Sequence, residues 1–462
     1  MSSLNECQTL CLAASPPCVA VILGGDVCFL RGGVTPPDCA DASWATLYVL
    51  APSPPLSPPS LPPVPSPPLP PSTPPLPPYM PATRCSSTDR GACVAFDTYE
   101  LEDGTTNGML LAPNRSLHTF ASESSGRQSV WLSDAVGQYV ETTARRAANS
   151  LVLRFSIPDS ADGAGTDASL SLYVDGVKRT TLSLTSHFAW SYGWGANGNY
   201  STMNDPALGG EAHHFFDDAR APPEQVGYIP PGASVRLQVD ADDAAAEYYI
   251  LDLIELERVG APLPRPAGSL SVLDFGAVAG DGLDDRAALE AAIAAAEAQM
   301  PRASVWLPPG AFHVSRKARP MDVDSIELLG AGMWHTSLHG TARFRCATNC
   351  TFSDFGIFGD EVARQPGGYH AFEGAAGRGT RLLNVWMEHT VCGYWVGPVV
   401  AGDTTALTED LRISGCRVRN TFADGINLCN GASDTTVEHC HVYLTKARTD
   451  LRCCSARSER QV

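Results

Sequence analysis

The amino-acid sequence predicts a mainly β protein, in which a β-sandwich precedes a truncated parallel β-helix and a small disulfide-rich unit forms the N-terminus. Three observations lead to this fold class. Strand-like runs separated by turn residues fill residues 90–260. In residues 268–462, short strand units recur at offsets of 30, 31 and 24 residues, a period that is typical of solenoids. A proline-rich stretch at residues 51–83 follows a cluster of cysteines in residues 1–50.

The composition indicates an acidic protein with hydrophobic cores. The chain has 462 residues, of which 44% are hydrophobic, and a formal net charge of −18. This apolar content argues against global disorder. The sequence shows no cluster of basic residues, which argues against a nucleic-acid partner. It also contains no apolar run long enough to span a membrane, and we expect a monomer.

The N-terminal region, residues 1–50, is rich in cysteine, and the whole chain has 15 cysteines. This usage is typical of an oxidising compartment, so we expect an extracellular, secreted protein. No signal peptide is visible, and we therefore expect the natural N-terminus to lie upstream. The stretch ECQTLCLAASPPCVAVILGGDVCFLRGG resembles part of the PAN/apple family of adhesion modules. A generic disulfide-stapled unit is the alternative.

The stretch at residues 51–83 predicts a linker, with repeats such as SPPLSPPSLPP. Proline fixes φ and removes a backbone donor, so the segment should adopt an extended polyproline II conformation. Such a segment acts as a semi-rigid spacer.

The runs of residues 90–260 predict an antiparallel β-sandwich. Within them, SLSLYVDGVKRTTLSL predicts a hairpin, because Asp-Gly favours a two-residue turn. Glu100 and Glu102 stand two residues apart on one face of a strand, and Asp252 lies in the last strand-like run. Carboxylates brought together suit calcium. A solvated strand face is the alternative interpretation.

The segment FAWSYGWGANGNYSTMNDPALGGEAHHFFDDARA combines aromatic residues with glycine and asparagine. Aromatic rings in loops can stack on the apolar faces of sugars, and polar side chains can hold the hydroxyl groups. A loop that packs its own aromatics is the alternative. The candidate carbohydrate-binding residues are Trp190, Tyr192, Trp194, Tyr200 and Asp217.

The region 268–462 opens with a strand, a Gly/Asp loop and an alanine-rich helix, in which Asp284 or Asp285 can cap the helix. Short units follow: FSDFGIFG, LLNVWMEHT, ISGCRVRNT and VEHCHVYLT. Because each coil of a solenoid stacks its inward residues on the next, these units should align. The predicted aligned positions are Phe355/Ile357, Val385/Met387, Cys416/Val418 and Cys440/Val442.

Two resemblances refine this interpretation. YELED, GRQSVWLSDAVGQYVETT and ILDLIELERV look like carbohydrate-binding modules of the family 6/35/36 type. That resemblance implies that Glu100, Glu102 and Asp252 are ligands of a structural calcium ion. The opening DFGAVAGDGLDDRAALEAAI is similar to the start of the pectate-lyase superfamily, which implies a right-handed, pectin-lyase-like β-helix. In that superfamily the aspartates of this loop are structural; here they are Asp281, Asp284 and Asp285.

The segments LLGAGMWHTSLHG, NVWMEHTVCGYWVGP and RNTFADGINLCNGASDTTVEH resemble the mycodextranase and α-1,3-glucanase family of glycoside hydrolases. The family supplies an aspartate in an ADGIN-like motif and an adjacent Asp pair one coil later. Asp424 in FADGIN matches the first, although Asp-Gly is equally typical of a turn. Aligning the coils places the pair at Ala447 and Arg448, neither of which can transfer a proton at neutral pH. Because the final residues lose the coil pattern, we expect further coils to be missing.

These observations leave three functional hypotheses. The first is a glycoside hydrolase acting on an α-1,3-glucan-like polysaccharide, with Asp424 as one catalytic carboxylate and no catalytic cofactor. The second is a non-catalytic protein that binds a glycan or a cell wall, which the missing Asp pair favours. The third is a pectin-active lyase or epimerase, which rests on the shared fold alone.

Overall fold

The computed structural model describes residues 20–24, 27–31, 45–49, 93–192, 203–209, 211–315, 319–363, 368–396, 407–428 and 432–446. The chain divides into two compact units, Met1–Pro77 and Pro78–Val462. In the first unit, β1 (Ala20–Gly24) pairs antiparallel with β2 (Val27–Arg31) and β3 (Ala45–Val49). The predicted linker at residues 51–83 lies outside the described residues.

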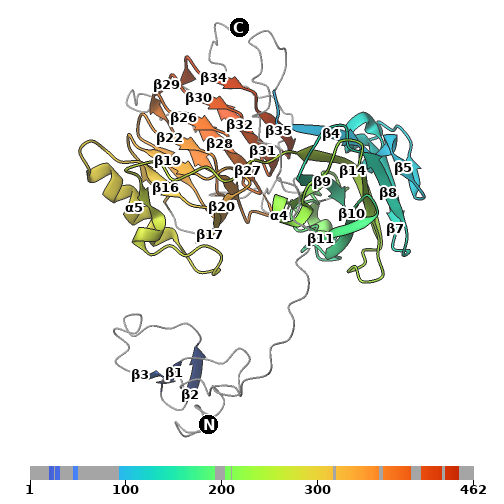
Figure 1. Ribbon diagram of the computed structural model, residues 1–462, viewed down its shortest axis with the longest axis horizontal. Helices are drawn as coiled ribbons and strands as arrows, with labels where there is room; N and C mark the ends of the chain where they lie inside the picture. The colour runs from blue at the N-terminus through green and yellow to red at the C-terminus, as the bar shows by residue number, and fades with distance from the viewer. Residues whose placement is uncertain are drawn as a thin grey trace, which may run out of the picture. The chain divides into compact units, whose positions relative to one another are not determined.

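Two antiparallel sheets open the second unit (Figure 1). One sheet has the order β11-β10-β13-β8-β5, and the other has the order β12-β9-β14-β7-β6, with β4 also pairing with β14. Apolar side chains from both sheets form one buried core, which is the packing that defines a β-sandwich. The strands are β4 (Phe96–Glu100), β5 (Thr105–Thr106), β6 (Met109–Leu111), β7 (Ser129–Ser133), β8 (Tyr139–Thr143), β9 (Ser150–Ser156), β10 (Asp167–Val174), β11 (Val177–Thr185), β12 (Asp217–Ala221), β13 (Ser234–Gln238) and β14 (Tyr248–Glu257).

The predicted hairpin is present. Val174 of β10 pairs with Val177 of β11, so that Asp175 and Gly176 alone form the turn. Both turn residues have positive φ, 49° and 73°, as a two-residue turn of this hand requires.

Parallel strands build the rest of the second unit, and they form three long ladders and one short one (Figure 1). The first ladder contains β15 (Leu270–Ser271), β16 (Val305–Leu307), β19 (Glu327–Gly330), β22 (Thr351–Ser353), β26 (Arg381–Leu383), β30 (Arg412–Ser414) and β34 (Thr436–Glu438). The second contains β17 (Gly310–Val314), β20 (Thr336–Gly340), β23 (Gly356–Phe358), β27 (Trp386–Glu388), β31 (Arg417–Thr421) and β35 (His441–Thr445). The third contains β18 (Met321–Val323), β21 (Phe344–Cys346), β24 (Phe372–Glu373), β28 (Tyr394–Val396) and β32 (Ile426–Leu428). The short ladder contains β25 (Gly377–Arg378), β29 (Thr408–Glu409) and β33 (Ala432–Ser433).

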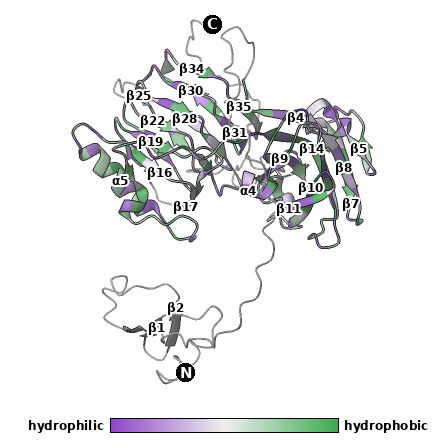
Figure 2. Ribbon diagram, viewed as in Figure 1, coloured by the Kyte–Doolittle hydropathy of each residue, from purple (hydrophilic) through white to green (hydrophobic). Residues whose placement is uncertain are grey.

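The predicted stacking of coils is confirmed in the second ladder. Ile357 pairs with Met387, Met387 with Val418, and Val418 with Val442. The first three side chains are fully buried in one apolar core that runs through the coils, and Figure 2 shows hydrophobic positions recurring along the stacked strands. The chain therefore forms a parallel β-helix, to whose core this ladder contributes one inward strand residue from each of these coils.

The Gly/Asp loop before α5 (Arg286–Ala298) is held by aspartates, as expected. The Asp284 carboxylate accepts a hydrogen bond from the first helical N–H, of Arg286, at 3.1 Å. Asp285 instead accepts from the backbone N–H groups of Val278 and His313, at 2.9 and 3.0 Å. These carboxylates therefore fix the loop against β17 and begin the helix.

One face of the sandwich docks on the second ladder of the β-helix. Val152 of β9 joins Phe358 and Trp386 in an apolar cluster. Arg417 of β31 donates to Glu257 of β14 at 2.6 Å, in an ion pair that is almost completely buried. Both parts belong to the same compact unit. This docking sets the positions of the side chains on the facing strands of the sandwich and the β-helix.

Within the described parts of the chain, no helix has both the length and the apolar character needed to cross a membrane.

The central ion pair of the docking face should be essential for stability. Arg419 is fully buried and pairs with Glu255 at 2.6 Å and with Asp218 at 3.3 Å. Arg419→Met would leave two buried carboxylates uncompensated, so we expect a loss of about 3–5 kcal/mol in the free energy of unfolding. Denaturant unfolding of the full chain measures it.

A matched control uses the exposed pair of Arg412 and Glu438 on the first ladder. The Arg412 side chain is 52% exposed, and Arg412→Met should cost less than about 1 kcal/mol. Similar losses for the two variants would contradict the assigned role of the docking face.

Candidate functional site

Asp424 lies in the loop between β31 and β32. The loop is held on the preceding coil, because the N–H groups of Phe422 and Ala423 donate to backbone carbonyls there at 3.0 and 2.7 Å. The Asp424 carboxylate is half-buried and accepts a hydrogen bond from Asn427 Nδ2 at 2.6 Å. The motif therefore forms a turn, and that turn also presents a carboxylate in a fixed position at the edge of the third ladder.

Trp395 lies on the third ladder, in register with Asn427, the residue that donates to this carboxylate. The residues on either side of Trp395 in β28 point into the core, so Trp395 points to the outer face. There it is half-buried and packs on an apolar cluster of Val391, Cys392 and Ala423. It pairs in register with Glu373 on one neighbouring coil and with Asn427 on the other. The His370 ring lies 4.9 Å from the Trp395 ring, centroid to centroid. An aromatic ring next to amide and carboxylate groups is a suitable surface for a sugar.

Trp395 was not among the candidate residues predicted from the sequence. The alternation of side chains along a strand could have identified it. In CGYWVGP, the tyrosine and the valine on either side of the tryptophan are apolar residues of a short strand. The tryptophan between them must then face outward, where a large aromatic residue calls for a functional explanation.

The two described aromatic residues that we expected to bind carbohydrate pack against the sandwich and are not exposed rings in a loop. Trp190 donates from Nε1 to the carbonyl of Ile157 at 3.0 Å and packs on an apolar cluster of the sandwich. Tyr192 stacks near Trp190 and donates to a neighbouring aspartate at 2.7 Å. Both rings are half-buried, and each has a partner within the sandwich. Trp194 and Tyr200 lie outside the described residues.

Asp217 does not lie in a surface loop, as a sugar ligand would. It begins β12 and is only 1% exposed. Its Oδ1 atom is 2.9 Å from His389 Nε2 and accepts from Asn420 Nδ2 at 2.6 Å. The carboxylate therefore faces the β-helix across the docking face. Burial opposes its ionisation, but His389 and the hydrogen bond from Asn420 outweigh burial and lower the pKa of Asp217.

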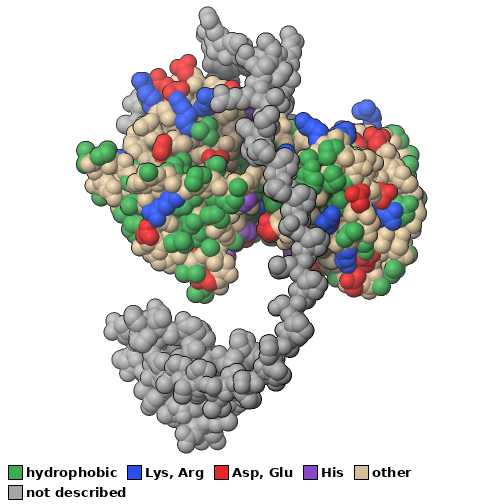
Figure 3. All heavy atoms as spheres, viewed as in Figure 1, with side chains coloured by type: hydrophobic (Ala, Val, Ile, Leu, Met, Phe, Trp, Pro, Cys, Tyr) green, Lys and Arg blue, Asp and Glu red, His purple; other side chains and the backbone are tan. Residues whose placement is uncertain are grey.

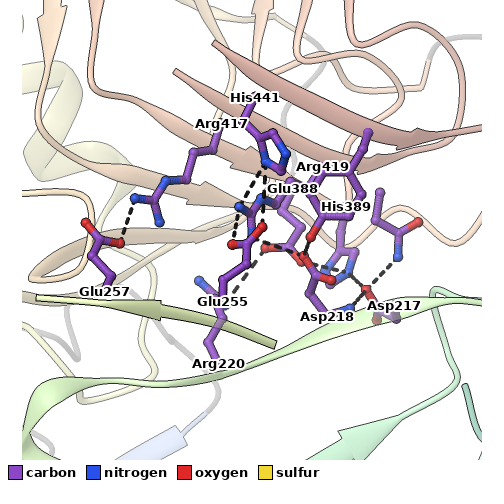
Figure 4. Close-up of polar contacts among 12 residues, drawn as sticks. Asp217, Asp218, Arg220, Glu255, Glu257, Glu388, His389, Arg417, Arg419 and His441 are labelled. Carbon is purple, nitrogen blue, oxygen red and sulfur yellow. Dashed lines mark hydrogen bonds and ion pairs between the residues drawn. The ribbon is translucent and has the colours of Figure 1, made fainter. Parts of the chain in front are cut away.

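The docking face brings together a group of charged side chains that the sequence left unassigned (Figure 4). They come from β12 and β14 of the sandwich and from β27, β31 and β35 of the β-helix. Burial raises the pKa of Asp218 to about 6, even though Arg419 lies next to it. The members are Asp217, Asp218, Arg220, Glu255, Glu257, Glu388, His389, Arg417, Arg419, Asn420, His441 and Tyr443.

A second group of carboxylates coincides with the predicted calcium ligands. Oxygen atoms of Glu100, Glu102 and Asp252 lie within 4.8 Å of one another. Burial raises the pKa of Glu102 and that of Asp252 to about 7, and one buried oxygen on each glutamate has no hydrogen-bond partner. Ser125 N–H and Arg154 satisfy Asp252 in part, at 3.0 and 3.1 Å. These oxygen donors fit a hard cation.

The fold and the outer-face site define a class of protein. A parallel β-helix that presents a fixed carboxylate on one coil and an outward tryptophan on the coil before it is suited to a carbohydrate, and the sandwich docked on it forms part of the same compact unit. Polysaccharide-active β-helix proteins are the class that combines these features.

Comparisons with known proteins specify the family. Residues 93–259 match the model described as "Alpha-1,3-glucanase catalytic domain D1", and residues 284–450 match "Alpha-1,3-glucanase catalytic domain D2". The chain belongs to the α-1,3-glucanase type of glycoside hydrolases. The region that we expected to be a carbohydrate-binding module thus corresponds to one of the two domains of the catalytic unit in this family.

Solved structures of this type are similar to the chain. The catalytic unit of a thermostable GH87 α-1,3-glucanase from Streptomyces thermodiastaticus strain HF3-3 is 30% identical, with a TM-score of 0.65 and 77% of this chain covered. The Agl-KA catalytic domain is 33% identical, with a TM-score of 0.66 and 76% of this chain covered. A GH87 catalytic domain in complex with nigerose is 26% identical, with a TM-score of 0.66 and 78% of this chain covered.

The matches span only part of these relatives. The chain covers 60%, 62% and 62% of the three solved chains. A shorter similarity, 47% identity over 72 residues, links it to a mannuronan C5-epimerase of Azotobacter vinelandii, covering 14% of this chain and 8% of the epimerase.

The docking face should weaken as His441 becomes protonated. Burial, together with Arg419 and Arg417, lowers the pKa of His441 to about 3, whereas unfolded histidine has a pKa of about 6.5. The unfolded chain therefore binds this proton more readily than the folded chain does. The contribution of neutral His441 is complete above about pH 6.5 and is lost as the pH falls toward about 3.

His441→Gln should remove that loss, so that the free energy of unfolding falls less steeply than in the wild type between these pH values. Urea unfolding at a series of pH values measures the slope. His187→Gln, at a histidine whose side chain is 44% exposed, should keep the wild-type slope. Equal slopes for His441→Gln and the wild type would contradict the assignment.

Proposed function

We propose that this chain acts on α-1,3-glucan as a glycoside hydrolase, with Asp424 as a catalytic carboxylate. The observation that carries the proposal is the position of Asp424 on the β-helix, in the D2 match, where it is bound by Asn427, which pairs in register with Trp395. A related catalytic domain is in complex with nigerose and another with tetrasaccharides. An outer face with these groups can hold a glucan chain by stacking on Trp395.

Glycoside hydrolysis needs one acid to protonate the leaving oxygen and one base or nucleophile on the other side of the bond. Asp424 supplies one of these carboxylates, and the hydrogen bond from Asn427 at 2.6 Å sets its orientation. Glu373, on the same outer face, is bound by the Arg343 guanidinium at 2.7 Å, so this glutamate is engaged elsewhere. Ala447 and Arg448, where the family pattern has its Asp pair, lie outside the described residues.

Ala447 and Arg448 favour a second function, which is the binding of glucan without its cleavage. Neither Ala447 nor Arg448 is able to exchange a proton at neutral pH, and a chain without the second carboxylate would bind glucan without cleaving it. In this function Trp395 retains its role as a platform, and Asp424 serves as a hydrogen-bond acceptor for a sugar hydroxyl.

We also propose a secreted location and a structural calcium ion in the sandwich. The cysteine content supports the location. The calcium ligands are Glu100, Glu102 and Asp252, whose oxygen atoms converge and include buried atoms without partners. Bound there, the ion would hold β4 and the residues after it against β14 and so stabilise the sheet that docks on the β-helix.

Asp424→Asn should abolish hydrolysis if the first function is correct. Loss of a general acid or base lowers the rate by about 10²–10⁴-fold, and the release of reducing ends from α-1,3-glucan measures it. Asp434→Asn is the matched control, because Asp434 is exposed in the turn before β34 and its positive φ of 50° suits asparagine. Equal activity of the two variants would contradict the role of Asp424.

Trp395→Ala should weaken the binding of α-1,3-linked oligosaccharides under either function. Stacking contributes about 0.5–1.5 kcal/mol beyond burial of area, so we expect at least a several-fold higher Kd by calorimetry. If the wild type binds the oligosaccharide but releases no reducing ends, the binding function holds. Unchanged affinity in Trp395→Ala would exclude the outer face as the glucan site.

Removal of calcium should destabilise the sandwich. Addition of calcium to chelator-treated protein should raise the Tm. At a hundredfold excess over Kd, the free energy of unfolding should rise by about 2.7 kcal/mol. Glu102→Gln should abolish the rise, and Glu247→Gln, at an exposed residue of the same sandwich, should retain it. The same rise in Glu102→Gln would show that the ion binds elsewhere.

A further inference from the structure

Glu388 is the least satisfied charged group of the docking face. It ends β27, is 0% exposed, and neither of its carboxylate oxygens has a hydrogen-bond partner. The nearest cationic atoms are His389 Nε2 at 3.8 Å and Arg220 Nε at 3.9 Å, both beyond hydrogen-bond length. Burial raises the pKa of Glu388 to about 7. A buried carboxylate without hydrogen bonds is costly, and a bound cation would supply the partner that Glu388 lacks.

Two further donor groups converge on Glu388 from different elements. His389 follows it directly, with a positive φ of 54° that turns the chain, and Asp217 comes from β12 of the sandwich. One donor atom from each of the three residues lies within 4.8 Å of the others. Metal–nitrogen and metal–oxygen bonds of about 2.0–2.2 Å could therefore reach all three after small side-chain rotations. Figure 4 shows Asp217, Glu388 and His389 grouped at one end of the charged cluster.

The surroundings hold these donors in place. The ring of Phe188 stacks on His389, with centroids 3.8 Å apart and planes 12° apart. Asn420 donates to Asp217 at 2.6 Å, as groups behind a metal ligand commonly do. The Arg220 guanidinium packs over the Phe358 ring, 3.3 Å from its centre, and its Nε stays 3.9 Å from Glu388.

The site also has room for water or another ligand. Asp217 and His389 line a cleft of about 820 Å³ between the sandwich and the β-helix. Its other walls include His339 and Ser337 of β20, and Figure 3 shows histidine and acidic side chains at the gap between these two parts. Two of the three donors therefore face open space while Glu388 lies behind them, which leaves room for the exchangeable ligand that many metal centres keep.

We propose that Asp217, Glu388 and His389 bind a divalent transition-metal ion, with Zn²⁺ the best match, and that the ion joins β12 of the sandwich to β27 of the β-helix. One imidazole and two carboxylates suit zinc or manganese, whereas calcium takes oxygen donors alone. This site is separate from the carboxylates of Glu100, Glu102 and Asp252, which carry no nitrogen ligand. The inference does not depend on any catalytic role of Asp424.

Titration of the metal-free full chain with Co²⁺ and with Zn²⁺ tests the proposal. Co²⁺ should give visible d–d bands without the charge-transfer bands of thiolate ligands, which separates this site from the 15 cysteines. Zn²⁺ should displace Co²⁺ and raise the Tm. Glu388→Gln and His389→Gln should each weaken binding by about 10-fold or more, as the loss of ligand-sphere groups does. Glu102→Gln, in the other carboxylate group, should bind as the wild type does.

Glu388→Gln also provides a check on folding, because it removes a buried charge and keeps the side-chain shape. Without metal, this variant should unfold at the same Tm as the wild type or at a higher one, but Zn²⁺ should no longer raise it. Any of three results would overturn the proposal: no Co²⁺ binding by the wild type, thiolate bands in its spectrum, or unchanged affinity in both variants.

Discussion

The buried ion pairs of Arg419 with Glu255 and Asp218 are the constraint on which the arrangement of the second unit depends. Charges removed from water are tolerated only when their partners are correctly placed. Two sheets that carry complementary charges on their outer faces can therefore dock in few registers, and Arg417 with Glu257 repeats the same requirement two residues earlier on β31. The apolar contact of Val152 with Trp386 adds burial, and the ion pairs specify the register.

This docking also fixes the surroundings of the outer-face site. Strand β31 supplies Arg419 to the docking face and then continues into the loop that carries Asp424. The same coil thus meets the sandwich on one side and presents a carboxylate on the other. Because the loop is hydrogen-bonded to the coil before it, Asp424, Asn427 and Trp395 lie on a rigid scaffold. A rigid scaffold of this kind is what a glycan site needs to orient a chain of sugars.

The parts of the structure that depend on local pattern could be predicted from the sequence. The spacing of Ile357, Met387 and Val418 gave the stacked coils, because one inward residue per coil must repeat, and Asp175-Gly176 gave the hairpin. The grouping of Glu100, Glu102 and Asp252 rested on a family resemblance, and the three carboxylates do converge. Their binding of calcium stays a prediction.

Features that depend on the meeting of two sheets could not be predicted in this way. Glu255 and Arg419 each alternate with apolar residues, a pattern equally typical of a solvated strand face. Only docking shows that both are buried, and it likewise places Asp217 among the charged side chains of the docking face.

The most direct test of the docking face as the organising constraint is native-state hydrogen exchange along the full chain. If the sandwich and the β-helix depend on each other, the protected amides of β14 and β31 should exchange through one shared opening, with the same free energy. Separate openings, in which β31 exchanges while β14 remains protected, would contradict this account.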